Sequence, residues 1–87
     1  MYVIIVYDIS VERVAKVCNF LRRYLVWVQN SVFEGELTDR QFTDVEYGLK
    51  KIIKKDKDSV RFYIIRSQDL VKVGNMGIEK ADQCTII

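Results

Sequence analysis

One carboxylate stands out near the start of the chain, because Asp8 closes an apolar and aromatic run that begins at Tyr2. The sequence contains no histidine, which removes the usual general base and a usual zinc ligand. A metal would therefore be held by carboxylate oxygens, which Mg²⁺ and Mn²⁺ prefer. Asp8 could equally end a strand and, with Ser10, support the turn into a helix. On the residues alone, the metal-binding and structural interpretations both stay open.

Basic residues are the second feature that could carry chemistry. A group of lysines lies near the end of a predicted helix: Lys50, Lys51, Lys54, Lys55 and Lys57. Cations are favoured at a helix C-terminus, so this group could be a solvated face. It could also bind nucleic-acid phosphates, and such contacts would be independent of base sequence and sensitive to salt. Cations of an earlier helix could extend the patch: Arg13, Lys16, Arg22 and Arg23.

Apolar stretches predict the strands that would hold these groups. Residues 2–8 are rich in β-branched and aromatic side chains, as expected for a strand. The segment VWVQNSVFEGEL predicts two short strands with a bend near Gln29 to Ser31, and its Gly35 suggests a bulge or bend. The segment VRFYIIRS predicts a further strand, and the terminal CTII also has strand character.

Two amphipathic stripes predict helices. The first follows Ser10, which is a plausible N-cap. Its apolar positions are Val14, Val17, Cys18, Leu21 and Leu25. The second follows Thr38 and Gln41, whose spacing is that of a capping box. Its apolar positions are Phe42, Val45, Leu49, Ile52 and Ile53.

The resulting order, β-α-β-β-α-β, predicts an α+β domain of the ferredoxin-like kind, with one antiparallel sheet and two helices on one face. We expect a single domain over residues 1–87, with a core at 2–66. The tail, residues 67–87, would contact a partner. Its CTII segment would add an extra C-terminal strand to a sheet edge, either its own or the partner's.

Both faces of the predicted sheet are largely apolar, although the helices can cover only one. Strand alternation places Asp8 on the same face as Ile4 and Val6. We therefore expect a homodimer in which an identical chain covers the second face, sheet against sheet, about a two-fold axis. If the face of Asp8 is the one that meets the partner, the two-fold axis would bring two copies of Asp8 together. A divalent cation between them would relieve their repulsion, polarise a phosphoryl oxygen and activate a water.

Composition excludes several classes of protein. The net charge of +2 alone says little about partners, and the longest apolar run is far shorter than the roughly 20 residues of a membrane span. The start of the chain has no signal-peptide pattern, so we expect a cytoplasmic protein without membrane contact. Cys18 and Cys84 are too isolated for a disulfide framework or a zinc site, and we expect both to be reduced.

The sequence resembles the small CRISPR-associated Cas2 family. The segments that carry the resemblance are YVIIVYDIS, RVAKVCNFL, VQNSVFEGEL and DSVRFYII, which together span most of residues 2–66. The resemblance implies a ferredoxin-like homodimer that acts in CRISPR spacer acquisition beside the Cas1 integrase. It also implies a Mg²⁺-dependent endonuclease, with Mn²⁺ as a possible substitute, that cuts single-stranded RNA or double-stranded DNA.

The resemblance further implies a set of site residues. Asp8 matches the metal-binding aspartate of the family, and Tyr7 matches the tyrosine before it. Ser31 and Phe33 match its SVF motif, and Arg13 matches a basic residue at the start of the first helix. The residues themselves allow Ser31 either to orient a phosphate or to bond within the sheet. They place Phe33 in the core more readily than on a base-stacking platform.

The chain departs from the family at two positions. Val11 and Trp27 stand where some members with nuclease activity carry arginine, and fewer cations near the phosphate weaken the case for strong catalysis. Glu34 and Glu36 could help to hold a metal, although solvated edge charges explain them as well.

Three functions therefore compete. The first is a dimeric, Mg²⁺-dependent endonuclease with Asp8 of both chains at the metal. The second is a non-catalytic dimer that bridges integrase subunits and holds protospacer DNA on its basic residues. The third is a toxin ribonuclease, because VapD-like toxins share this fold and the aspartate at the strand end.

Overall fold

The computed structural model describes residues 1–78, and its elements follow the predicted order. They are β1 (Tyr2–Asp8), α1 (Val11–Leu21), β2 (Val26–Gln29), β3 (Val32–Glu36), α2 (Asp39–Ile52), β4 (Ser59–Ile65) and a short 3-10 helix, Gln68–Leu70. The α+β prediction is confirmed. The predicted CTII strand lies outside the described residues. Within residues 1–78, no helix is both long and apolar enough to cross a membrane.

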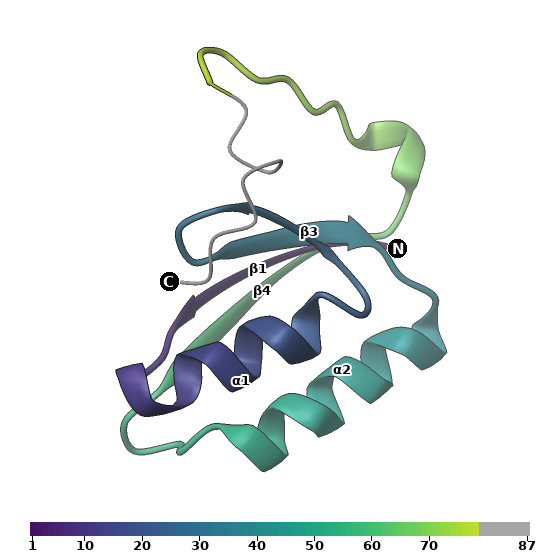
Figure 1. The fold of residues 1–87 in the computed structure, drawn as a ribbon. Coiled ribbons are helices and arrows are strands. Elements are labelled where there is room, and N and C mark those ends of the chain that lie inside the picture. The colour runs from purple at the N-terminus through teal and green to yellow at the C-terminus, as the bar shows by residue number, and fades with distance from the viewer. Residues whose placement is uncertain (79–87) are drawn as a thin grey trace.

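The four strands form one antiparallel sheet in the order β2-β3-β1-β4. Both helices lie on one side of this sheet, as Figure 1 shows, which gives the two-layer ferredoxin-like arrangement. β1 therefore has a neighbouring strand on each side. Neither α1 nor α2 lies over the other side of the sheet, and we call that side the open face.

The core lies between the sheet and the helices. Alternate residues of β1 point into it, so Val3 and Ile5 are 0% exposed. Phe33 of β3 is also 0% exposed, and its ring centroid lies 6.1 Å from that of Tyr7. The interpretation of Phe33 as a core residue is therefore confirmed. From the helices, the core receives Val17, Cys18, Leu21, Val45 and Leu49.

The ends of the helices match the sequence only in part. The capping box of α2 is present, with Thr38 and Gln41 bonding to each other's backbone N–H groups. Ser10 stands at the N-cap of α1, but its side chain makes no capping bond. α1 ends at Leu21 instead of running to Leu25, because the chain then enters tight turns that still bring Leu25 into the core.

The two helices approach closely where the ring of Phe20 lies against Gly48. A Cβ at Gly48 would come within 2.1 Å of the tip of this ring. The glycine therefore lets an aromatic side chain of α1 pack directly on the backbone of α2, which fixes the separation of the helices at this point.

The open face keeps apolar groups in contact with solvent. Val6 of β1, Val26 of β2 and Tyr63 of β4 are 38%, 60% and 48% exposed. Asp8 is exposed on the same face as Val6, as strand alternation predicts.

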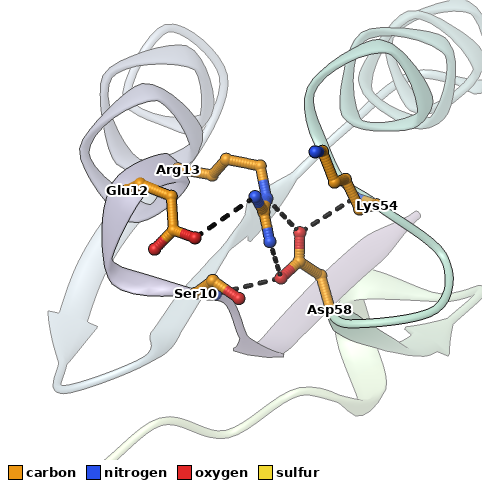
Figure 2. Close-up of polar contacts among 5 residues, drawn as sticks. All are labelled: Ser10, Glu12, Arg13, Lys54 and Asp58. Carbon is orange, nitrogen blue, oxygen red and sulfur yellow. Dashed lines mark hydrogen bonds and ion pairs between the residues drawn. The ribbon is translucent and has the colours of Figure 1, made fainter.

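A buried carboxylate joins the turn between β1 and α1 to the loop between α2 and β4. Asp58 precedes β4, and its side chain is 0% exposed. It accepts hydrogen bonds from Nε and Nη2 of Arg13 at 2.6 and 2.9 Å (Figure 2). It also accepts from the backbone N–H of Ser10 at 3.0 Å and of Lys54 at 2.9 Å. We call these four contacts the Asp58 clamp.

The clamp strongly favours the ionised form of Asp58. The Arg13 hydrogen bonds, together with the N–H groups of Lys54 and Ser10, hold the pKa of this carboxyl well below its ordinary value of 3.8, although burial opposes the shift. Because the pKa of Asp58 is lower in the folded than in the unfolded chain, the ionised carboxylate stabilises the fold at pH values above the pKa of the unfolded chain. The stabilisation is lost as the pH falls below that value.

We predict that Asp58→Asn lowers the melting temperature by several degrees near pH 7, because it breaks the bidentate pair and leaves the Arg13 guanidinium without its partner. The difference between the wild type and the variant should shrink below about pH 4, where the unfolded chain takes up the proton. Thermal unfolding followed by circular dichroism over this pH range measures both effects.

Asp56→Asn is the matched control, since Asp56 is exposed in the same loop and outside the clamp. It should change the melting temperature little. If the melting temperature of the wild type exceeded that of Asp58→Asn by the same amount at pH 7 and at pH 3, the claim that the clamp stabilises the ionised form of Asp58 would be wrong.

Candidate functional site

Asp8 lies at the end of β1, directly opposite Ser59 at the start of β4. Within the described residues its carboxylate makes no hydrogen bond or ion pair, whereas Asp58 next to Ser59 is fully engaged. The β1–α1 turn, the α2–β4 loop and the β2–β3 turn all lie at this end of the sheet (Figure 1). Asp8 is thus an accessible carboxylate beside three connections.

One copy of the chain offers only part of a metal site. Residues 1–78 contain no group of three or more Cys, Asp or Glu side chains that could hold an ion. Mg²⁺ is commonly bound by one or two carboxylates and keeps several waters. The exposed Asp8 suits this oxygen chemistry, but it supplies one carboxylate, and a second would have to come from elsewhere.

Glu34 and Glu36 do not supply that second carboxylate. Glu34 pairs with Ile4 in the sheet, four residues before Asp8, which is roughly 13 Å along a strand. It accepts a hydrogen bond from the Tyr2 hydroxyl at 2.7 Å, and burial together with this bond raises the pKa of Tyr2 to about 12. Glu36 forms an ion pair with the amino group of Met1 at 2.8 Å.

Tyr7 faces away from Asp8. Its side chain is 4% exposed in the core, and its hydroxyl lies 3.0 Å from Sγ of Cys18. Burial and the Cys18 contact raise the pKa of Tyr7, so its proton stays in place. Adjacent residues of a strand point to opposite faces, so Tyr7 packs in the core while Asp8 faces solvent. The catalytic role of Tyr7 beside Asp8 stays a prediction.

Ser31 lies in the β2–β3 turn after Asn30, which has a positive φ of 43°. The carbonyl of Ser31 accepts a hydrogen bond from the backbone N–H of Tyr7 at 3.1 Å. This contact brings Ser31 to the same end of the sheet as Asp8.

Arg13 is committed to Asp58 instead of facing solvent. Its side chain is 12% exposed, and its guanidinium also lies 3.7 Å from Glu12. These carboxylates compete with any phosphate for Arg13, which weakens its predicted role in catalysis and nucleic-acid binding. Sequence reasoning missed Asp58, because a residue 45 positions from Arg13 gives no local signal.

The structure divides the predicted nucleic-acid-binding lysines into two groups. Lys16, Lys51 and Lys54 line one groove between α1 and α2, which we call the interhelical groove. Lys50 and Lys55 line a separate hollow between α2 and β4. The predicted nucleic-acid-binding lysines therefore do not all line the same hollow.

Comparison with known proteins identifies relatives of the whole chain. A family model described as CRISPR associated protein Cas2 matches residues 1–73. A CRISPR-associated endoribonuclease Cas2 of Methanosarcina acetivorans is 49% identical over the full length of both chains. A second protein of that name, from Pyrococcus furiosus, is 54% identical over 92% of each chain.

Solved structures agree with these matches. A crystal structure of Cas2 superposes with a TM-score of 0.81 at 48% identity, covering 93% of this chain and 91% of the other. Cas2 of Streptococcus pyogenes superposes with a TM-score of 0.74 at 34% identity, covering 88% and 100%. On its sequence, its fold and these relatives, the chain belongs to the CRISPR-associated Cas2 family.

Proposed function

We propose that this chain forms a two-fold dimer that acts as a Mg²⁺-dependent endonuclease on RNA or duplex DNA, in the spacer-acquisition stage of CRISPR defence. The observation that carries the proposal is the position of Asp8, exposed at the end of an inner strand on an apolar face that the helices leave open. The family assignment favours this function over a toxin ribonuclease, and the curated relatives are named as endoribonucleases.

The dimer follows from the open face. Val6, Val26 and Tyr63 lie there with substantial exposure, and Ile4 and Val32 are only half-buried. A second copy that presents the same face would remove these groups from water, which favours association. Asp8 lies on that face, so a two-fold axis near the end of β1 would bring the two carboxylates together.

The paired carboxylates would create the missing half of the metal site. Asp8 of each copy would hold Mg²⁺, and their mutual repulsion would be relieved in the process. When bound, such an ion polarises a phosphoryl oxygen and lowers the pKa of a water molecule. Within the chain, Asp8 has the task of binding and orienting. The sheet and the Asp58 clamp fix the backbone on either side of it.

We predict that Asp8→Ala lowers the cleavage rate by more than roughly a hundredfold, while the dimer persists. Loss of a residue that only supports a metal ligand costs up to about a hundredfold, and loss of the ligand itself should cost more. The assay compares cleavage of labelled RNA and duplex DNA with and without Mg²⁺, and light scattering gives the mass. Asp44→Ala, which removes an exposed carboxylate on α2, should cleave like the wild type. Robust cleavage by Asp8→Ala, or by wild type in excess chelator, would refute the metal site.

We also predict that Tyr63→Glu weakens the dimer, because it places a charge in the apolar interface. The dissociation constant should rise about 30-fold or more, which corresponds to the roughly 2 kcal/mol of a hot-spot residue. Sedimentation velocity over a range of concentrations measures this, and cleavage should fall in parallel with the dimer fraction.

Val11→Glu is the control, since Val11 is 84% exposed at the start of α1 in the helix layer and receives the same charge. It should leave the dimer intact. A Tyr63→Glu chain that sediments as a dimer at the same concentrations as the wild type would show that the open face is not the interface.

A further inference from the structure

Arg61 is the one basic residue in the sheet. The four strands, whose sequences are YVIIVYD, VWVQ, VFEGE and SVRFYII, contain no other lysine or arginine. Arg61 lies in β4 directly opposite Val6 of β1, and Val6 points to the open face. Directly opposite residues share a face of the sheet, so the exposed Arg61 side chain stands on the open face together with Asp8.

Arg61 is also a diagonal neighbour of Asp8. Asp8 is opposite Ser59, and Arg61 is two residues further along the same strand. Diagonal neighbours on one face of an antiparallel pair are about 7–8 Å apart, which is within reach of a long side chain. Within residues 1–78, neither Asp8 nor Arg61 takes part in an ion pair. A group bound between the two side chains could therefore contact both.

The other carboxylates of the open face are not placed to neutralise Arg61. Glu34 and Glu36 belong to β3, which lies on the far side of β1 from β4. Glu34 accepts a hydrogen bond from Tyr2, and Glu36 pairs with the amino terminus of the chain. A guanidinium that loses its water without gaining an anion is destabilising. A second copy that covers the open face therefore creates a need for an anion beside Arg61.

Cleavage of a phosphodiester has a use for such a cation. Negative charge grows on the phosphoryl oxygens in the transition state, and a cation already held in place there lowers the barrier. Arg13 is engaged with Asp58, so it does not face the Asp8 side of the sheet as a solvated cation. Arg61 stays charged, because hydrogen bonding with the Tyr63 side chain raises its pKa. Its planar guanidinium can contact two phosphoryl oxygens at once.

We propose that the guanidinium of Arg61 binds the phosphoryl oxygens of the phosphodiester that is cleaved at Asp8. The inference rests on the proposed function, which supplies the dimer and the metal. In that dimer the charges of two Asp8 carboxylates and two Arg61 guanidinium groups cancel. A bound Mg²⁺ then leaves two positive charges, which suit a phosphodiester whose negative charge grows in the transition state.

The role of Arg61 is electrostatic, and the residue transfers no proton. A water oxygen attacks phosphorus, and the bond from phosphorus to the leaving oxygen breaks. The proton lost by the water goes to the leaving oxygen or to solvent, while Arg61 keeps its own protons throughout. A contact with phosphoryl oxygens carries no information about the base sequence.

The first experiment measures kcat for the labelled RNA or duplex DNA that the wild type cleaves, at several Mg²⁺ concentrations. Arg61→Gln should lower kcat at least about a hundredfold, as expected for loss of a preorganised donor to the reacting group. The Mg²⁺ concentration that gives half the maximal rate should not rise, because removing a cation near the metal lessens repulsion. Arg61→Lys should restore part of the rate, since it keeps the charge but loses the planar fork.

Arg40→Gln is the matched control. It makes the same exchange at a side chain that is 89% exposed near the start of α2, in the helix layer. It should cleave like the wild type at every Mg²⁺ concentration. Sedimentation velocity should show that both glutamine variants form the same dimer as the wild type.

Two results of this experiment would overturn the inference. The first is an Arg61→Gln chain that cleaves within about threefold of the wild type. The second is a loss of cleavage that comes with a raised Mg²⁺ requirement or with dissociation of the dimer. Arg61 would then keep the metal site or the interface in shape instead of contacting the phosphate.

A binding measurement separates this inference from the proposed function. Fluorescence anisotropy with labelled RNA in excess chelator compares the Asp8→Ala chain with a chain that also carries Arg61→Gln. Loss of Arg61 should weaken binding several-fold and reduce the salt dependence of log K by about 0.7 for each phosphate contact that is lost.

The combined outcomes identify which proposal fails. If Asp8→Ala still cleaves while Arg61→Gln weakens both cleavage and binding, the metal site is wrong and the Arg61 contact stands. If Asp8→Ala is inactive while Arg61→Gln cleaves and binds normally, the Arg61 contact is wrong and the metal site stands.

Discussion

Four hydrogen bonds to the Asp58 carboxylate hold together the end of the domain where the candidate functional groups lie. The carboxylate joins the turn that follows Asp8 to the loop that precedes β4, and it does so through Ser10, Arg13 and Lys54. Removing a carboxylate from water is unfavourable unless its acceptor sites are filled, and here both oxygens accept two bonds. The turn that follows Asp8 is therefore held by a carboxylate that is itself shielded from solvent.

The Asp58 carboxylate also determines which of the neighbouring cations are paired and which are exposed. It keeps Arg13 from acting as a surface cation, and it holds the backbone of Lys54 while leaving the ammonium group exposed. Lys16, Arg23, Lys51 and Lys54 line the groove beside the helices, whereas Asp8 lies on the open face of the sheet, where Arg61 of β4 is also exposed opposite Val6. The groove and Asp8 therefore lie at different places on the domain, although Arg13 and Lys54 of the groove also bond to Asp58, next to the turn that follows Asp8.

Local patterns predict the elements and the faces of this fold correctly wherever the responsible forces act over a few residues. Strand alternation places Asp8 with Val6 on one face and Tyr7 in the core. The capping box at Thr38 fixes the start of α2. The same reasoning misplaces the end of α1, because Leu25 continues the apolar stripe although the chain has already left the helix. A buried residue in a turn satisfies the pattern as well as one in a helix.

The sequence by itself determined the order of the elements, the parity of Asp8, the core position of Phe33 and the family, because each follows from short spacings or contiguous motifs. Only the tertiary structure decided which charged side chains are paired and which remain exposed to solvent. Arg13 and Asp58 are 45 positions apart, and the lysines of α2 turn to two different hollows. Pairing across such distances depends on how the helices and loops pack on the sheet, and no local spacing records it.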